Sequence, residues 1–215
     1  MLNQQKIRMS KALCNITLCL GEGMLCNKIE RNFNYMDIQR ETIRHVLAAL
    51  AYRTQKALRD ADERFSNFKA GHGTRTPTEL VRHMSSVLGY ARTFFIGGIF
   101  RADPLPTFSD EVERFHTLVA DLSAHLSAGT EIKEISLNQL LQGPISDAMT
   151  HSGQLAMLRR LAGLPVTSEN FIFAEISPET LGRDQPLPAA PDSIWLGKII
   201  HFAWGLRRFL KKKSS

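Results

Sequence analysis

Asp147 and His151 can both bind a metal ion, and they interrupt an apolar helical stripe within residues 145–166. Because they are four residues apart, they lie one turn apart on the same face of a helix. The stripe continues with Leu155, Leu158 and Ala162. This face is therefore predicted to point into the protein interior, where a carboxylate without a partner is costly. The pattern predicts that Asp147 meets either a cation or a hydrogen-bond donor.

A second predicted helix contributes another imidazole, that of His83. The predicted buried face of this helix consists of Leu80, Met84, Val87, Ala91 and Phe94. His83 lies within the same stripe, so two imidazoles and one carboxylate are expected to converge from two helices. One divalent ion would satisfy all three, since imidazole nitrogens and carboxylate oxygens are common ligands of zinc and related metals. The alternative is an ordinary polar pair, in which Asp147 accepts a hydrogen bond from His151 or His83, and the spacing leaves both open.

Helical patterns run through the part of the chain that must position these residues, and no alternating run is long enough to predict a sheet. Helices are expected over residues 37–61, 77–100, 109–128 and 144–163, with a short turn at 137–143. The apolar faces of the first and third helices consist of Ile43, Val46, Leu47, Leu50, Thr54, Ala57 and Leu58, and of Val112, Phe115, Val119, Leu122 and Leu126. Four helices with one-sided stripes predict an all-α, up-and-down four-helix bundle.

The second helix has the clearest start signal in the chain. Thr76 is the expected N-cap, Pro77 the first helical residue and Glu79 the reciprocal partner of a capping box. Glu79 also precedes His83 by one turn and is a candidate fourth ligand, but the capping box explains it more simply. The remaining histidines are interpreted as helix-surface or edge residues (His45, His116, His125 and His201) or as part of a glycine-rich connection (His72).

The two ends of the chain differ from its body. Residues 1–35 show no clear period and are predicted to be a loosely ordered appendage, with Met36 beginning the folded unit at 36–190. The stretch 191–215 is predicted to form a basic amphipathic helix, from about 192 to 212. Its apolar face could pack on the bundle or on an anionic membrane surface, but the apolar run is too interrupted to span a bilayer.

Charge and cysteine usage narrow the classes of function. The net charge is +6, of which +3 lies in residues 1–35 and +5 in 207–215, leaving 36–206 at −2. A slightly acidic body lacks the clustered Lys and Arg that a nucleic-acid-binding domain needs. The three cysteines, Cys14, Cys19 and Cys26, all lie near the N-terminus. The body therefore has no disulfide framework, which fits a reducing, cytoplasmic location.

Two segments carry a family resemblance: "RTPTELVRHMSSVLGYA", and downstream "GPISDAMTHSGQLAMLRRLAGLPV". Together they resemble the DinB/YfiT-like superfamily of metal-binding four-helix bundles, and the resemblance spans about Asp37 to Pro188. It implies a metal site made by His83, Asp147 and His151, with Asp147 standing where the superfamily usually has a histidine. The implied ion is divalent, zinc first, with nickel, iron or manganese as alternatives. Gln154, one turn beyond His151, is the candidate residue for orienting a ligand or a bound water.

The resemblance also implies a function. Three protein ligands leave a coordination position open, as catalytic sites do, and the superfamily includes thiol-dependent transferases and presumed metal-dependent hydrolases. The expected partner is a small-molecule substrate or a low-molecular-weight thiol, with no nucleic acid. A peripheral membrane contact at the inner membrane surface and a homodimer are left open. No residue besides the ligands receives a catalytic role. The alternative is a non-catalytic metal-binding or interaction bundle.

Overall fold

The computed structural model describes residues 23–189, and every regular element in that range is a helix. Four are long: α2 (Gly23–Leu58), α4 (Pro77–Ile96), α5 (Phe108–Ser127) and α7 (Ser146–Leu161). The short elements are α3 (Glu63–Ser66), α6 (Leu137–Leu140), the π-helical η1 (Leu141–Ile145) and the 3-10 helix η2 (Phe171–Phe173). The all-α prediction is thus confirmed for the described residues. The predicted helix at 192–212 lies outside them, as do residues 1–22 of the predicted appendage.

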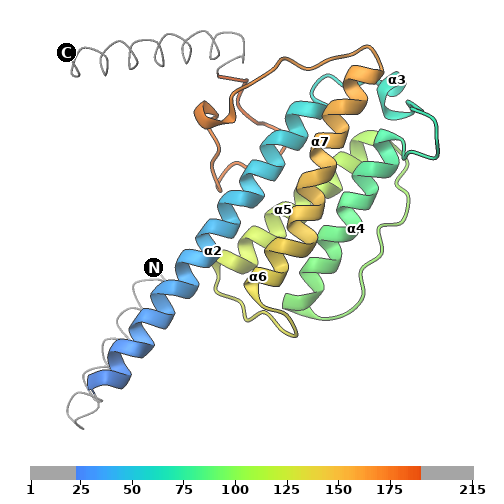
Figure 1. Ribbon diagram of the computed structural model, residues 1–215. Coiled ribbons are helices and arrows are strands. Elements are labelled where there is room, and N and C mark those ends of the chain that lie inside the picture. The colour runs from blue at the N-terminus through green and yellow to red at the C-terminus, as the bar shows by residue number, and fades with distance from the viewer. Residues whose placement is uncertain (1–22, 190–215) are drawn as a thin grey trace, which may run out of the picture.

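The long helices pack around one hydrophobic core (Figure 1). On α2 the predicted apolar face is confirmed, with Leu47 and Leu50 fully buried and Val46 partly buried at its edge. The predicted face of α5 is buried throughout. The predicted start of the first helix near Asp37 is wrong, because α2 begins at Gly23 and its first turns extend beyond the other helices (Figure 1). No proline interrupts residues 23–58, and an amphipathic period reports packing rather than helicity.

Helices α4 and α5 run parallel, so the chain departs from the expected up-and-down order. Near their starts, Arg82 Nε donates to Glu111 Oε1 at 2.7 Å. Near their ends, the rings of Phe95 and His125 stack with centroids 5.4 Å apart. Residues 97–107 connect the two by returning along the length of the bundle (Figure 1). A 20-residue helix is about 30 Å long, and an extended segment of 11 residues can span roughly 36 Å.

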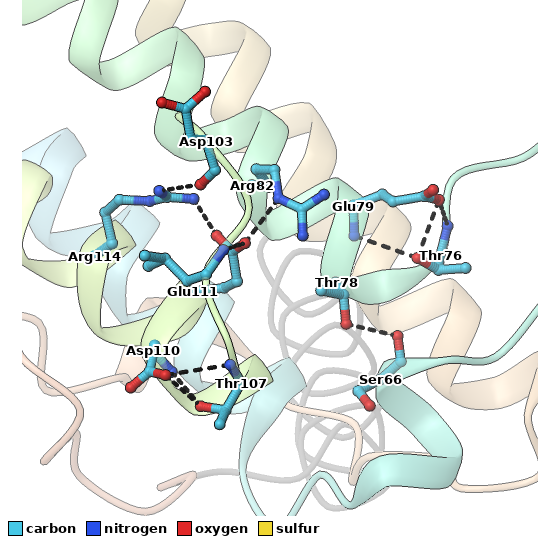
Figure 2. A network of polar contacts seen from close by, with 11 residues as sticks. Ser66, Thr76, Thr78, Glu79, Arg82, Asp103, Thr107, Asp110, Glu111 and Arg114 are labelled. Atoms are coloured by element: carbon cyan, nitrogen blue, oxygen red, sulfur yellow. Dashed lines mark hydrogen bonds and ion pairs between the residues drawn. The ribbon is translucent and has the colours of Figure 1, made fainter. Parts of the chain in front are cut away.

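A buried carboxylate fastens this return segment to both helices (Figure 2). Glu111, whose side chain is fully buried, accepts hydrogen bonds from Arg82 and from the backbone N–H of Leu105, the latter at 2.9 Å. Its other oxygen pairs with Arg114, which also donates to the carbonyl of Asp103 at 2.6 Å. The clamp therefore joins α4, α5 and the return segment at one point. Arg82 directly precedes His83, so the clamp also fixes the part of α4 that carries this candidate ligand.

The last long helix is continuous with the two short elements before it, which corrects the turn expected at residues 137–143. Helical structure runs from Leu137 to Leu161 through α6, η1 and α7, after a capping box formed by Ser136 and Gln139. Pro144 lies inside the π-helical stretch. Proline lacks the N–H that a regular helix uses, and the wider turn accommodates it. The hydroxyl of Ser146 donates to the carbonyl of Leu141 at 2.7 Å, which satisfies one backbone acceptor of the bulge.

No helix within residues 23–189 combines the length and the apolar character that crossing a membrane requires.

Candidate metal centre

The three predicted ligands meet where the first half of α4 lies against α7. Asp147 Oδ2 is 3.8 Å from His83 Nε2, and Asp147 Oδ1 is 3.4 Å from His151 Nε2. The two imidazole rings lie edge to face, with centroids 4.8 Å apart. One ligand atom from each residue can be chosen so that all three lie within 4.8 Å of one another. The group could therefore hold a metal ion.

The site lies at the edge of the bundle rather than in its interior, which corrects the predicted helix faces. The side chain of Asp147 is 48% exposed, that of His83 31% and that of His151 10%. On α7 the core position beside Asp147 is taken by Ala148, which is fully buried. On α4 the core contains Leu88 and Phe95, whereas the predicted Val87 and Phe94 are only partly buried. The argument from the cost of a buried carboxylate therefore does not apply to Asp147.

His151 is held with one nitrogen toward the site. Its Nδ1 lies 2.8 Å from Oε1 of Gln154. An amide oxygen only accepts, so this contact favours the tautomer protonated at Nδ1, in which Nε2 has a free lone pair. That Nε2 is buried and has no hydrogen-bond partner among the described residues. Gln154, predicted on the interior side of the helix, is exposed, but its contact with His151 is the one expected of a residue that orients a ligand.

His83 is electrostatically suited to ligation. Burial lowers its pKa below the ordinary value of 6.5, the neighbouring Arg75 and His151 lower it further, and Asp147 opposes them. The ring is therefore mainly neutral at pH 7. A metal ligand needs this state, because the protonated ring has no free lone pair.

The two separations between Asp147 and the histidines are close to those that a small ion requires. Two ligands about 2.1 Å from a tetrahedral zinc ion lie roughly 3.4 Å apart. The distance from Asp147 to His151 matches this value, and the distance from Asp147 to His83 exceeds it by a few tenths of an ångström. By contrast, a hydrogen bond between an imidazole and a carboxylate is usually 2.7–3.2 Å long. Both distances from Asp147 are longer than such a hydrogen bond and are compatible with an ion between the three side chains.

Asp147 also borders an open groove of about 720 Å³ between α4 and the η1–α7 stretch. Ser86, Val87 and Tyr90 form the α4 side, and the other side runs from Gln142 to Thr150. Apart from Asp147, these residues were not predicted to belong to a site. Only their position on the helices beside Asp147 could have indicated them, and that position depends on the bulge at η1.

Glu79 serves the helix cap and not the site. Its carboxylate accepts from the backbone N–H of Thr76 at 2.8 Å and from the Thr76 hydroxyl at 3.0 Å, while the Glu79 N–H donates back to that hydroxyl. The predicted capping box is therefore confirmed (Figure 2).

The other histidines take three different positions. His116, expected at the surface, is buried, which corrects that prediction. Its Nδ1 lies 2.7 Å from the carbonyl oxygen of Leu181, and its Nε2 lies 3.2 Å from Oε1 of Gln55. His45 is exposed and His72 lies in an exposed turn, both as expected. His125 is partly buried against Phe95, and His201 lies outside the described residues.

Comparison of the chain with protein-family models, with curated proteins and with solved structures gave no match.

Proposed function

We propose that His83, Asp147 and His151 bind one divalent metal ion, with zinc as the first candidate and nickel, iron or manganese as alternatives. We further propose that the chain is a metal-dependent hydrolase or a thiol-dependent transferase of the DinB/YfiT-like kind suggested by its sequence. The observation that carries the first proposal is the buried Nε2 of His151, which faces Asp147 without a hydrogen bond.

Two features of this atom favour a metal over the ordinary polar pair. A buried polar atom without a partner costs about 1–3 kcal/mol, and a coordinate bond would remove that cost. The contact from Nδ1 to Oε1 of Gln154 favours the tautomer in which Nε2 accepts rather than donates. In that tautomer Nε2 of His151 has no proton to give to Asp147, and Nε2 of His83, at 3.8 Å from Asp147, is beyond hydrogen-bond distance. The arrangement resembles the orienting contacts found around metal-bound histidines.

The exposure of the site supports a catalytic role. A divalent ion with three protein ligands can supply a nucleophile at neutral pH, either by lowering the pKa of a bound water or by binding a thiolate. The residues of the chain then have separable tasks. His83 and His151 hold the ion from two helices, Gln154 orients His151, and the half-exposed Asp147 joins the ligand set to the groove. Among the described residues that line the groove, Asp147 alone has a carboxylate or an imidazole.

Metal content of purified full-length protein tests the ligand set. After loading with zinc and desalting, we expect close to one equivalent by mass spectrometry, and much less in His83→Ala and His151→Ala. The most informative variant is Asp147→Asn, which keeps the shape of the side chain and removes its charge. If Asp147 is only a polar partner, this variant should be as stable as the parent and neither should retain zinc, which would refute the site.

Glu79→Gln is the matched control. Glutamine also completes a capping box, so this variant should fold and retain a full equivalent of zinc. A loss of zinc there would identify Glu79 as a ligand and would contradict the assignment of its carboxylate to the cap.

A further inference from the structure

The groove beside Asp147 has the dimensions of a small-molecule site. Its volume of about 720 Å³ lies within the range of roughly 300–1,000 Å³ that is typical of ligand pockets. It shares Asp147 with the candidate metal ligands, so a molecule in the groove would reach the metal position with one end. The rest of that molecule would lie between α4 and the η1–α7 stretch.

The lining of the groove carries almost no charge. Asp147 is the one residue with a formal charge among the described residues that form its walls, and neither Lys nor Arg is among them. Carboxylates and phosphates are recognised mainly by such cationic side chains. The described walls beyond Asp147 therefore offer no cationic partner to a ligand whose distal part is anionic. The polarity that remains is uncharged and comes from Ser86, Tyr90, Gln142, Ser146 and Thr150.

Tyr90 presents an oriented aromatic surface in this groove. The residue is 57% exposed, and its ring lies edge to face with that of Phe94, centroids 4.9 Å apart at 73°. Val87 and Pro144 add apolar surface beside it. Aromatic side chains offer a large contact area and favour stacked or edge-on partners. An apolar ring fits this environment better than a flexible charged chain.

We propose that the groove binds substrates that combine a metal-binding oxygen at one end with an uncharged apolar ring at the other. This proposal rests on the proposed metal centre. Tyr90 is the residue that selects the ring. The substrate class is thereby narrowed to neutral aromatic or cyclic molecules, and low-molecular-weight thiols with several carboxylates are disfavoured.

The test uses full-length protein loaded with cobalt(II), whose visible spectrum reports ligand binding without any need for turnover. Three hydroxamates serve as probes: acetohydroxamate, benzohydroxamate and 4-carboxybenzohydroxamate. Covering about 60 Å² of ring surface corresponds to roughly ten-fold in affinity, so benzohydroxamate should bind at least about ten-fold more tightly than acetohydroxamate. The added carboxylate should remove most of that gain.

Variants assign the preference to the groove. Tyr90→Ala should bring the affinities for benzohydroxamate and acetohydroxamate close together, whereas Tyr90→Phe should keep them apart. Ile96→Ala is the matched control, because Ile96 is also on α4 and 50% exposed but does not line the groove. This control should retain the parent's preference.

The outcomes separate the two proposals. One outcome is that cobalt binds without tighter binding of benzohydroxamate than of acetohydroxamate, or with the same difference in Tyr90→Ala as in the parent. Either result would show that the groove does not bind the ring, and the metal centre would stand. Tighter binding of the carboxylated probe would overturn the charge argument. If the folded protein takes up neither cobalt nor zinc, the metal centre and the inference that rests on it both fall.

Discussion

Replacing Glu111 by glutamine should destabilise the protein strongly, although the two side chains have nearly the same shape. The Glu111 carboxylate is fully buried and receives donors from Arg82, Arg114 and the Leu105 backbone. A glutamine can accept through one oxygen only, and its amide group would point hydrogens at a guanidinium that has only hydrogens to offer. Both arginines would also lose their counter-charge in a setting where their side chains are only 25% and 17% exposed.

The size of the effect follows from this burial. Removing one member of a buried ion pair costs about 3–5 kcal/mol, a large part of the 5–15 kcal/mol that stabilises a typical domain. With a urea slope of about 2 kcal/mol per molar, the unfolding midpoint should fall by about 1.5–2.5 M. The slope itself should not change, because the surface exposed on unfolding stays the same.

Urea unfolding followed by circular dichroism at 222 nm measures this shift. Glu113→Gln is the control, since Glu113 is exposed on the same helix and the substitution removes the same charge. Its stability should change by no more than about 0.5 kcal/mol. Equal midpoints for the two variants would refute the assignment of the Glu111 clamp as a main fastening of α4, α5 and the return segment.

Three further outcomes are expected. Gln154→Ala should weaken zinc binding about ten- to hundred-fold in a competition titration, because Gln154 acts through His151. The metal-free variant should be as stable as the parent, since Gln154 is exposed. An unchanged zinc affinity would contradict the orienting role of Gln154. Zinc at about one hundred times its Kd should raise the Tm by roughly 5–10 °C in a thermal scan, and a chelator should reverse the rise; an equal rise in Asp147→Asn would place the binding elsewhere. Burial lowers the pKa of His116 below 6.5, so in mildly acidic solution the unfolded chain binds a proton that the folded chain does not. The free energy of unfolding should therefore fall as the pH drops from 7 toward about 5. In urea titrations His116→Gln should depend less on pH than the parent, and an equal pH dependence would contradict the role given to His116.

Local signals in the sequence predicted much of the fold. The capping box of Thr76 and Glu79 could be predicted from the sequence because it depends on residues three apart in the chain. The structure confirms both of its hydrogen bonds. The apolar stripe of α5 was equally reliable, since a single regular period covers its whole length. The three candidate ligands are also brought together as expected. Convergence of this kind needs only the correct pairing of two helices.

Features that depend on contacts between distant segments could not be predicted from the sequence. His116 is buried because the irregular segment near Leu181 packs over α5, and that segment has no period from which its position could be inferred. The parallel course of α4 and α5 depends on Glu111 meeting Arg82 and Leu105 across the bundle. Nothing in the helical pattern indicates the direction of a helix. A long connection permits either direction, and the buried clamp selects one.

The position of Asp147 shows how one local irregularity changes a functional interpretation. Leu140 and Ile145 are both fully buried although they are five residues apart. In a regular α-helix such residues point about 140° apart, but the π-helical turn between them lets both face the core. The bulge thus sets the phase of α7, so that Ala148 is buried and Asp147 lies at the edge of the bundle. A regular helix through Pro144 would have to turn either Leu140 or Ile145 away from the core. The π-helical turn that accommodates Pro144 therefore also leaves the candidate carboxylate ligand, Asp147, open to the groove.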